Sequence, residues 1–277
     1  MPAPASAAGT IVSCCGVQIG FDAAPDVVDR VVALLPPDAA VTVRGSTAET
    51  PAEPSDVRFR VAPSGTSFAE IWCDDELVGT ADDVESLAVT VASLVHVAIA
   101  NHPSDLLFVH AGAVAWRGHG VVIPGRTMSG KSTLVRALVE LGAAYYSDEY
   151  AVLDPQGLLH PYARPISMRT GSGNVLVAPE TLGPVGSEPV PVALVVSTRF
   201  HPQGRWAPKR SSGAATVLPL VENTVLARTA PERMLQAHAE LSASALCLTG
   251  PRGDAETTAA AILTQLEEVI DSGEVTR

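Results

Sequence analysis

The sequence predicts an α/β protein whose larger part is organised around one strand–loop–helix unit. Three apolar residues at positions 121–123 are typical of a buried strand, and residues 133–141 repeat apolar side chains at helical spacing. Further strand and helix patterns alternate towards the C-terminus, whereas the first part of the chain shows mainly short strands. We therefore expect an α/β domain with a mixed sheet over residues 83–277, preceded by a small β-rich α+β module over residues 1–82.

The small module is predicted from short apolar runs separated by turn residues. Its strands are expected at residues 11–21, 41–44, 57–61, 68–73 and 76–79. One helix is expected at residues 26–35, where Pro36 and Pro37 end it. The sequence of this region shows no group of residues typical of a catalytic site, so we expect it to serve recognition or scaffolding rather than catalysis.

The larger domain is expected to begin with a helix that runs from Asp82 and Asp83 to Asn101. Its apolar run, residues 87–100, is shorter than the roughly 20 residues of a membrane span, which predicts a buried helix. Strands are then expected at residues 106–110, 112–116, 143–146, 150–153, 190–198 and 245–248, and helices at residues 232–241 and 255–270.

The overall charge and the cysteines restrict the class of protein. A net charge of −12 argues against a general binder of nucleic acid or of anionic membranes. The four cysteines form no Cys-x-x-Cys pair, which favours reduced thiols and a cytoplasmic location. The first residues lack the charged and apolar regions of a secretion signal.

A phosphate-binding motif lies between the strand at 121–123 and the helix that follows it. The run Gly-Arg-Thr-Met-Ser-Gly-Lys-Ser fits Gly-x-x-x-x-Gly-Lys-Ser/Thr at every fixed position, and the chain has only two lysines. Glycines allow successive N–H groups to face a phosphate, the lysine contacts the β- and γ-phosphates, and the serine ligates Mg²⁺. The predicted nucleotide-binding residues are Gly125, Arg126, Thr127, Met128, Ser129, Gly130, Lys131, Ser132 and Thr133.

A Mg²⁺-dependent transferase also needs carboxylates beside this loop. Asp148 and Glu149 follow the next predicted strand, about 16 residues after Lys131, and Ser132, Asp148 and Glu149 are the predicted metal ligands. His110 ends the strand at 106–110 and is either a structural histidine or a residue that orients a catalytic carboxylate. The basic segment 199–212 is either a solvated loop or a mobile contact for an anion or substrate. Mg²⁺ is the metal we expect, because no cluster has zinc spacing.

Together these residues resemble a known family. The segment 109–111, the loop 125–132 and Ser147-Asp148-Glu149 resemble the HPr kinase/phosphorylase catalytic domain, as does the later segment 165–169. The resemblance is closer to HPr-kinase-related proteins encoded beside peptide-modification genes, including lasso-peptide kinases. It covers roughly residue 83 to the C-terminus.

The resemblance implies a P-loop kinase fold related to phosphoenolpyruvate carboxykinase and ATP-dependent phosphorylation of a serine hydroxyl. By position, Asp148 matches the family's base, Glu149 its acidic neighbour, His110 the histidine nearby and Arg169 a loop arginine. Two departures matter. The acidic pair is Asp-Glu rather than Asp-Asp, and Ser167 replaces a glutamate, so phosphorylase activity is not predicted.

The sequence thus predicts a cytoplasmic kinase that uses ATP and Mg²⁺, with Asp148, Lys131, His110 and Arg169 as catalytic residues. The expected acceptor is a serine hydroxyl of a peptide or small protein, and a homo-oligomer is possible. Two alternatives stay open, namely a kinase of a small-molecule hydroxyl and an ATP-binding subunit without catalytic activity. An Asp148→Asn variant separates a kinase from a binding subunit, and the fraction of a lysate that takes label from γ-labelled ATP separates the two acceptors.

Overall fold

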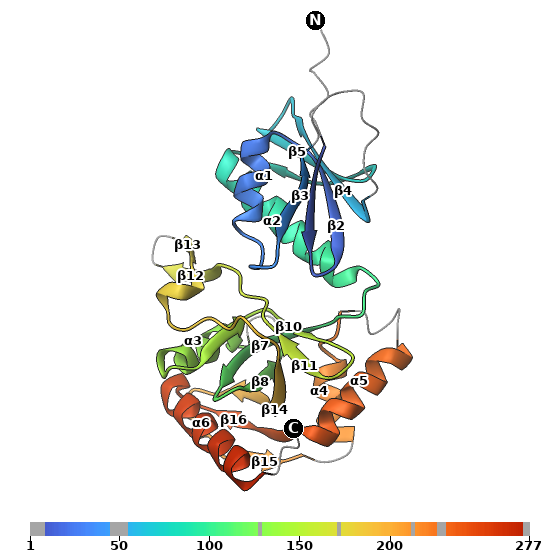
Figure 1. The fold of residues 1–277 in the computed structure, drawn as a ribbon. Coiled ribbons are helices and arrows are strands. Elements are labelled where there is room, and N and C mark those ends of the chain that lie inside the picture. The colour runs from blue at the N-terminus through green and yellow to red at the C-terminus, as the bar shows by residue number, and fades with distance from the viewer. Residues whose placement is uncertain are drawn as a thin grey trace, which may run out of the picture. The chain divides into compact units, whose positions relative to one another are not determined.

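The chain forms two compact units, Met1–Ser104 and Asp105–Arg277, which are described one at a time (Figure 1). A computed structural model describes residues 9–44, 55–126, 129–170, 173–211, 214–225 and 231–273. The division lies after Ser104 rather than at the predicted residue 82. The reason is that the helix α2 (Val84–Asn101) packs against elements of the first unit.

The first unit is a six-stranded sheet in the order β3-β1-β2-β4-β5-β6. Its strands are β1 (Thr10–Cys14), β2 (Val17–Asp22), β3 (Ala40–Arg44), β4 (Val57–Pro63), β5 (Ala69–Cys73) and β6 (Glu76–Ala81). All neighbours are antiparallel except β2 and β4. The single strand predicted at 11–21 is a hairpin instead, because Cys15 and Gly16 take positive φ values and reverse the chain.

Two helices accompany this sheet, α1 (Pro25–Val32) and α2, and they pack against each other. Asp83 caps α2 and forms a reciprocal capping box with Ser86. Within the described residues, α2 is the helix that is long and apolar enough to span a membrane. One of its faces is buried in the unit, through residues such as Leu87, Val91 and Val95, as expected for a core helix.

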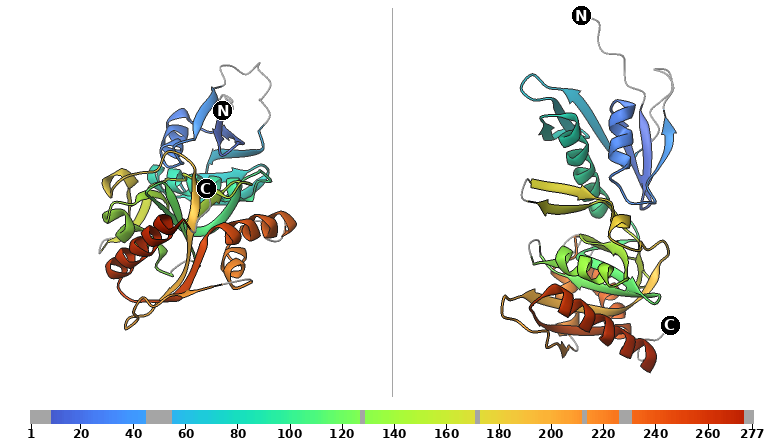
Figure 2. Two further views of the ribbon diagram at one scale, coloured as in Figure 1. Left: turned by 60° about the horizontal axis from the view of Figure 1, so that its bottom comes forward. Right: turned by 90° about the vertical axis from the view of Figure 1, so that its left-hand side faces the viewer.

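The second unit is built on an eight-stranded mixed sheet in the order β11-β10-β7-β8-β14-β16-β15, with β9 also paired to β7. Figure 2 gives two further views of the ribbon. The strands are β7 (Leu107–Trp116), β8 (His119–Pro124), β9 (Ala144–Ser147), β10 (Tyr150–Leu153), β11 (Leu158–His160), β14 (Val190–Phe200), β15 (Lys209–Arg210) and β16 (Leu246–Arg252). β8, β14 and β16 are parallel, so their carboxyl ends share one edge. The predicted α/β class with a mixed sheet is confirmed.

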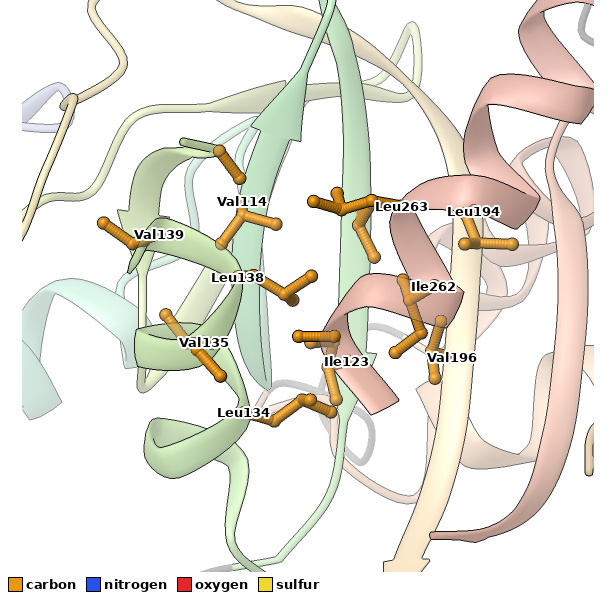
Figure 3. Packing of buried hydrophobic residues seen from close by; sticks show 14 of the residues in the cluster. Val114, Ile123, Leu134, Val135, Leu138, Val139, Leu194, Val196, Ile262 and Leu263 are labelled. Atoms are coloured by element: carbon orange, nitrogen blue, oxygen red, sulfur yellow. The ribbon is translucent and has the colours of Figure 1, made fainter. Parts of the chain in front are cut away.

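Helices cover both faces of this sheet. The helices are α3 (Lys131–Glu140), α4 (Ala214–Val221), α5 (Pro231–Ser244) and α6 (Ala255–Ser272), with a 3₁₀ turn at Pro179–Thr181. Alternate residues of β8 face opposite layers, as a pleated strand requires. Val121 and Ile123 pack in a cluster with residues of α3 and α6, and Figure 3 shows Ile123 between these two helices. Val122 packs in the cluster that includes residues of α4 and α5.

Several elements differ from the sequence prediction. Two strands were expected at 106–110 and 112–116, but β7 is continuous. Gly112 serves close packing there rather than a turn, since a Cβ at this position would lie 2.5 Å from Cγ2 of Val135 on α3. The predicted loop 199–212 is partly strand, in β14 and β15. β11, α4 and the hairpin of β12 (Ile166–Thr170) and β13 (Gly173–Val177) were not predicted.

Candidate functional site

The glycine loop connects β8 to α3 at the shared carboxyl edge of the parallel strands. The Gly125 N–H donates to the carbonyl of His110 at 3.2 Å, which ties the loop to β7. Gly130 has a φ of 84°, and α3 begins after it without a hydrogen bond from a capping side chain. No side chain therefore accepts from its first N–H groups, as in an anion-binding helix terminus. Thr127 and Met128 lie outside the described residues.

Lys131 is the first residue of α3, its side chain contacts this loop, and it is only 8% exposed. Its Nζ donates to the carbonyls of Gly125 at 2.6 Å and Arg126 at 3.0 Å. Burial lowers the pKa of Lys131, and the Asp148 carboxylate opposes that shift. The hydroxyl-bearing residues Ser132 and Thr133 are exposed. The loop thus holds a cation through neutral carbonyl groups.

The acidic pair lies where β9 gives way to β10, and both strands run antiparallel to β7. Ser147 Oγ accepts from the N–H of Glu149 at 3.2 Å and of Tyr150 at 3.0 Å. The Ala111 N–H donates to the carbonyl of Glu149 at 3.0 Å. Backbone and hydroxyl contacts therefore fix the pair next to the strand that carries His110.

Asp148 is held by a buried tyrosine. The hydroxyl of Tyr145 donates to Asp148 Oδ1 at 3.0 Å. Burial raises the pKa of Tyr145 well above its ordinary value, and the negative charge of Asp148 raises it further, so Tyr145 stays a donor. Asp148 also acts electrostatically on Lys131 and on Arg164. The structure therefore brings together the predicted lysine and the predicted base.

Arg164 is a site residue that the sequence did not indicate. It forms an ion pair with the carboxylate of Glu149. Burial lowers its pKa, whereas Asp148 and Tyr145 raise it. Its Nε is buried without a hydrogen-bond partner in the described part of the chain. Glu149, predicted as a metal ligand, is thus already engaged by a cation, and its role as a ligand stays a prediction.

His110 lies on β7 opposite Tyr150, and the two ring centroids are 5.1 Å apart. Burial is the main cause that lowers its pKa below the ordinary 6.5, and the positive charges of Lys131 and Arg164 add to the shift. The imidazole is therefore neutral at pH 7. Its Nδ1 is buried without a partner among the described residues. The predicted hydrogen bond from His110 to the catalytic carboxylate stays a prediction.

Arg252, the last residue of β16, is a second arginine that the sequence did not indicate. It is 2% exposed, and its Nη2 donates to the carbonyl of Gly130 at 2.8 Å. Its guanidinium carbon lies 5.4 Å from the ring centroid of Phe200, at the end of β14. The ends of parallel strands meet at one edge of a sheet, so a strand predicted to end at Arg252 would have placed this residue beside the loop. The predicted strand at 245–248 ended too early to reveal that placement.

Two other predicted features are Arg169 and the basic segment 199–212. Arg169 is in β12, in register with Asn174 of β13, and its predicted catalytic role stays a prediction. Within the basic segment 199–212, Trp206 donates through Nε1 to Gln265 of α6 at 3.0 Å. Lys209 and Arg210 pair with β16 as the strand β15. Part of that segment is therefore attached to the sheet and to α6 rather than a freely solvated loop.

Of the comparisons with known proteins, the one with solved structures gives a match. No family model matches the chain, and no curated protein matches it. Among solved structures, it is similar to the HPr(Ser) kinase/phosphatase from Coxiella burnetii, with 17% identity over 59% of this chain and 98% of that chain. The TM-score is 0.37. A likeness at this level supports no conclusion about a reaction, so function is inferred from the site itself.

Proposed function

We propose that the second unit is an HPr-kinase-like P-loop kinase domain, related in fold to phosphoenolpyruvate carboxykinase. It would transfer the γ-phosphoryl group of ATP to a hydroxyl group, that of a serine in a peptide or small protein. The observation that carries this proposal is the pairing of two groups across the site. Lys131 is buried in a glycine loop, and Asp148, held by Tyr145, lies within its electrostatic reach.

The residues present fit Mg²⁺-bound ATP. The N-terminus of α3 has no side-chain cap, and the Lys131 ammonium is satisfied by carbonyls that phosphate oxygens can replace. The exposed hydroxyl of Ser132 and the carboxylate of Asp148 would hold Mg²⁺, with Glu149 as a further ligand. When bound, the nucleotide and its metal supply the phosphoryl group and neutralise its charge.

The chain's own residues then have separate tasks. Asp148 receives the proton of the acceptor hydroxyl. The hydroxyl oxygen forms a bond to the γ-phosphorus as the bond from that phosphorus to ADP breaks. Tyr145 fixes one oxygen of that carboxylate. Lys131 and Arg164 offset negative charge in the site. Arg252 holds the Gly130 carbonyl and thereby the entry of the loop into α3.

The distribution of arginine contacts favours a catalytic role over simple binding. Arg164 pairs with Glu149 and leaves Asp148 with a neutral hydroxyl donor, which suits a base. A cytoplasmic location and a homo-oligomeric state are part of the proposal. A small-molecule hydroxyl as acceptor and an ATP-binding subunit without turnover are the competing functions.

The test uses γ-labelled ATP, Mg²⁺ and size-fractionated lysate from the protein's own source. We expect label in a peptide or protein fraction and a loss of turnover of about 10²–10⁴-fold in Asp148→Asn. The affinity for ATP measured without Mg²⁺ should be unchanged, because Asp148 is also a proposed Mg²⁺ ligand. Asp271→Asn is the matched control, because Asp271 is an exposed acid on α6 that pairs with Arg117. Label in metabolites would support a small-molecule kinase. ATP binding without label, or full activity in Asp148→Asn, would contradict the kinase proposal.

A further inference from the structure

A second group of ligand-type side chains lies in the first unit, at the turn between β1 and β2. Cys14 ends β1, Cys15 begins the turn, and Asp38 comes from the segment after α1. The Sγ atoms of Cys14 and Cys15 are 4.0 Å apart, and Cys14 Sγ lies 3.7 Å from Asp38 Oδ1. Among the described residues, these three form the group of His, Cys, Asp or Glu close enough to share one ion.

The backbone explains how two adjacent cysteines come to share a side. Successive side chains of an extended strand point to opposite faces, which would separate the two sulfurs. Cys15 instead has a φ of 51°, in the left-handed region that non-glycine residues seldom adopt. The turn therefore brings its side chain back towards that of Cys14. The sequence alone placed the pair as ordinary reduced thiols, and all four cysteines are indeed free.

Asp38 is oriented before any ion binds. Its Oδ2 accepts the N–H of Cys15 at 2.7 Å, which leaves Oδ1 on the side of the sulfurs. The segment that carries it is a turn, in which the N–H of Ala39 donates to the carbonyl of Pro36 at 2.9 Å. One carboxylate oxygen thus has a structural partner, while the other faces the thiols.

We propose that Cys14, Cys15 and Asp38 bind a thiophilic divalent cation of the zinc class. Tetrahedral zinc with Zn–S bonds of about 2.3 Å requires sulfurs about 3.8 Å apart and a sulfur-to-oxygen separation of about 3.5 Å. The observed 4.0 Å and 3.7 Å are close to both requirements. Each thiol releases its proton to solvent as its sulfur bonds to the metal.

Accessibility completes the case for this site. Cys14 is buried and Cys15 half-buried, whereas Asp38 is exposed, so an ion can enter from solvent. Three protein ligands leave the fourth position of a tetrahedron to water. Binding would link the β1–β2 turn to the segment after α1, and it would stabilise the folded chain by mass action. The proposal is independent of the kinase activity in the second unit.

The test is a titration of the reduced, metal-free full chain with Zn²⁺ against a chromophoric chelator. We expect one tightly bound Zn²⁺ per chain and, with Cd²⁺ as the probe, an ultraviolet charge-transfer band from thiolate to metal. Cys15→Ser should weaken Zn²⁺ binding more than about 100-fold and remove most of the band, since even outer-shell changes cost 10–100-fold. Cys73→Ser, which alters a free cysteine on β5, is the matched control and should bind like the wild type.

Asp38→Asn separates a ligand from a structural role. Its amide oxygen can still accept the Cys15 N–H, but it lacks the carboxylate charge, so we expect weaker Zn²⁺ binding with an unchanged melting temperature in the absence of metal. A wild type that binds Zn²⁺ no more tightly than Cys15→Ser would overturn the proposal, as would absence of the Cd²⁺ band. Equal affinity in Asp38→Asn and wild type would overturn the three-ligand site. The Cd²⁺ band of the wild type decides the matter even where a variant does not fold.

Discussion

The two sides of the candidate site in the second unit are built in different ways. The loop side, residues 125–133, is continuous in sequence, and its contacts run mainly through backbone groups such as the carbonyls of Gly125 and Arg126 that hold Lys131. The acidic side, Asp148 and Glu149, depends on contacts between side chains from separate elements, Tyr145 and Arg164. Backbone contacts persist through most substitutions, whereas side-chain contacts are lost with a single one.

This difference leads to a division of roles that experiments can test. A backbone cradle with a buried lysine suits binding of a polyphosphate, and a carboxylate held by a tyrosine suits proton transfer. Changes on the loop side should therefore reduce nucleotide affinity, whether or not they also reduce turnover. Changes on the acidic side should reduce turnover and leave nucleotide affinity nearly unchanged.

The largest effect is expected for Lys131→Met. The change removes the buried ammonium that contacts the Gly125 and Arg126 carbonyls, and phosphoryl transfer should fall about 10³-fold, as when a key charge-stabilising donor is lost. ATP affinity should fall as well, measured by calorimetry beside the labelling assay. Lys209→Met is the matched control, because Lys209 is the other lysine of the chain and lies exposed on β15. Equal losses in both variants would remove Lys131 from the site.

A smaller effect, confined to binding, is expected for Arg252→Met. The carbonyl of Gly130 would lose the charged donor Arg252, at a cost of about 1.5–3 kcal/mol, and would keep the N–H of Leu134 as its donor. We expect weaker ATP binding by about tenfold or more, with turnover at saturating ATP within about threefold of the wild type. Arg199→Met, an exposed arginine on neighbouring β14, is the control. A loss of turnover at saturating ATP would place Arg252 in the chemistry instead.

For the ion pair of Arg164 and Glu149 we expect the reverse of the Arg252→Met result, namely reduced turnover with little change in ATP affinity. A double-mutant cycle with Arg164→Met and Glu149→Gln should give a coupling of up to about 1 kcal/mol in unfolding free energy, because the Glu149 side chain is 37% exposed and solvent screens the pair. Turnover should fall in Arg164→Met while ATP affinity stays within about threefold. If affinity fell as much as turnover, the division between the two sides would be wrong.

The same contrast explains what the sequence could predict. The sequence predicts the loop because a contiguous motif between a strand and a helix identifies itself, and it predicts Asp148 because that residue follows the next strand. Arg164 and Arg252 reach the site through the tertiary fold, from a connection after β11 and from the end of β16. No local spacing marks either residue. The sequence predicts a break in this strand between His110 and Gly112, because only the packing of α3 shows why a continuous strand has a glycine there.

The smallest effect is expected at His110, which lies between the two sides. Its pKa is lowered by burial and by Lys131 and Arg164, so it is neutral at pH 7 and gains a proton only below pH 6.5. A proton on His110 would add a third positive charge that repels Lys131 and Arg164, the two cations that offset negative charge in the site. We therefore expect wild-type turnover to fall as the pH drops below 6.5. His110→Gln should flatten that fall and change turnover at pH 7.5 by less than about tenfold.

Folding must be followed in the same pH series, because a second histidine also titrates there. His238 is fully buried, and burial lowers its pKa from 6.5 to about 4. The unfolded chain therefore binds more protons than the folded one between pH 6.5 and pH 4, and up to about 3 kcal/mol of stability is lost as the pH falls through that window. His110→Gln should keep this loss of stability while losing the acid limb of turnover. If melting temperature and turnover fell together in the wild type and the variant alike, unfolding would account for the acid limb, and His110 would have no electrostatic part in the site.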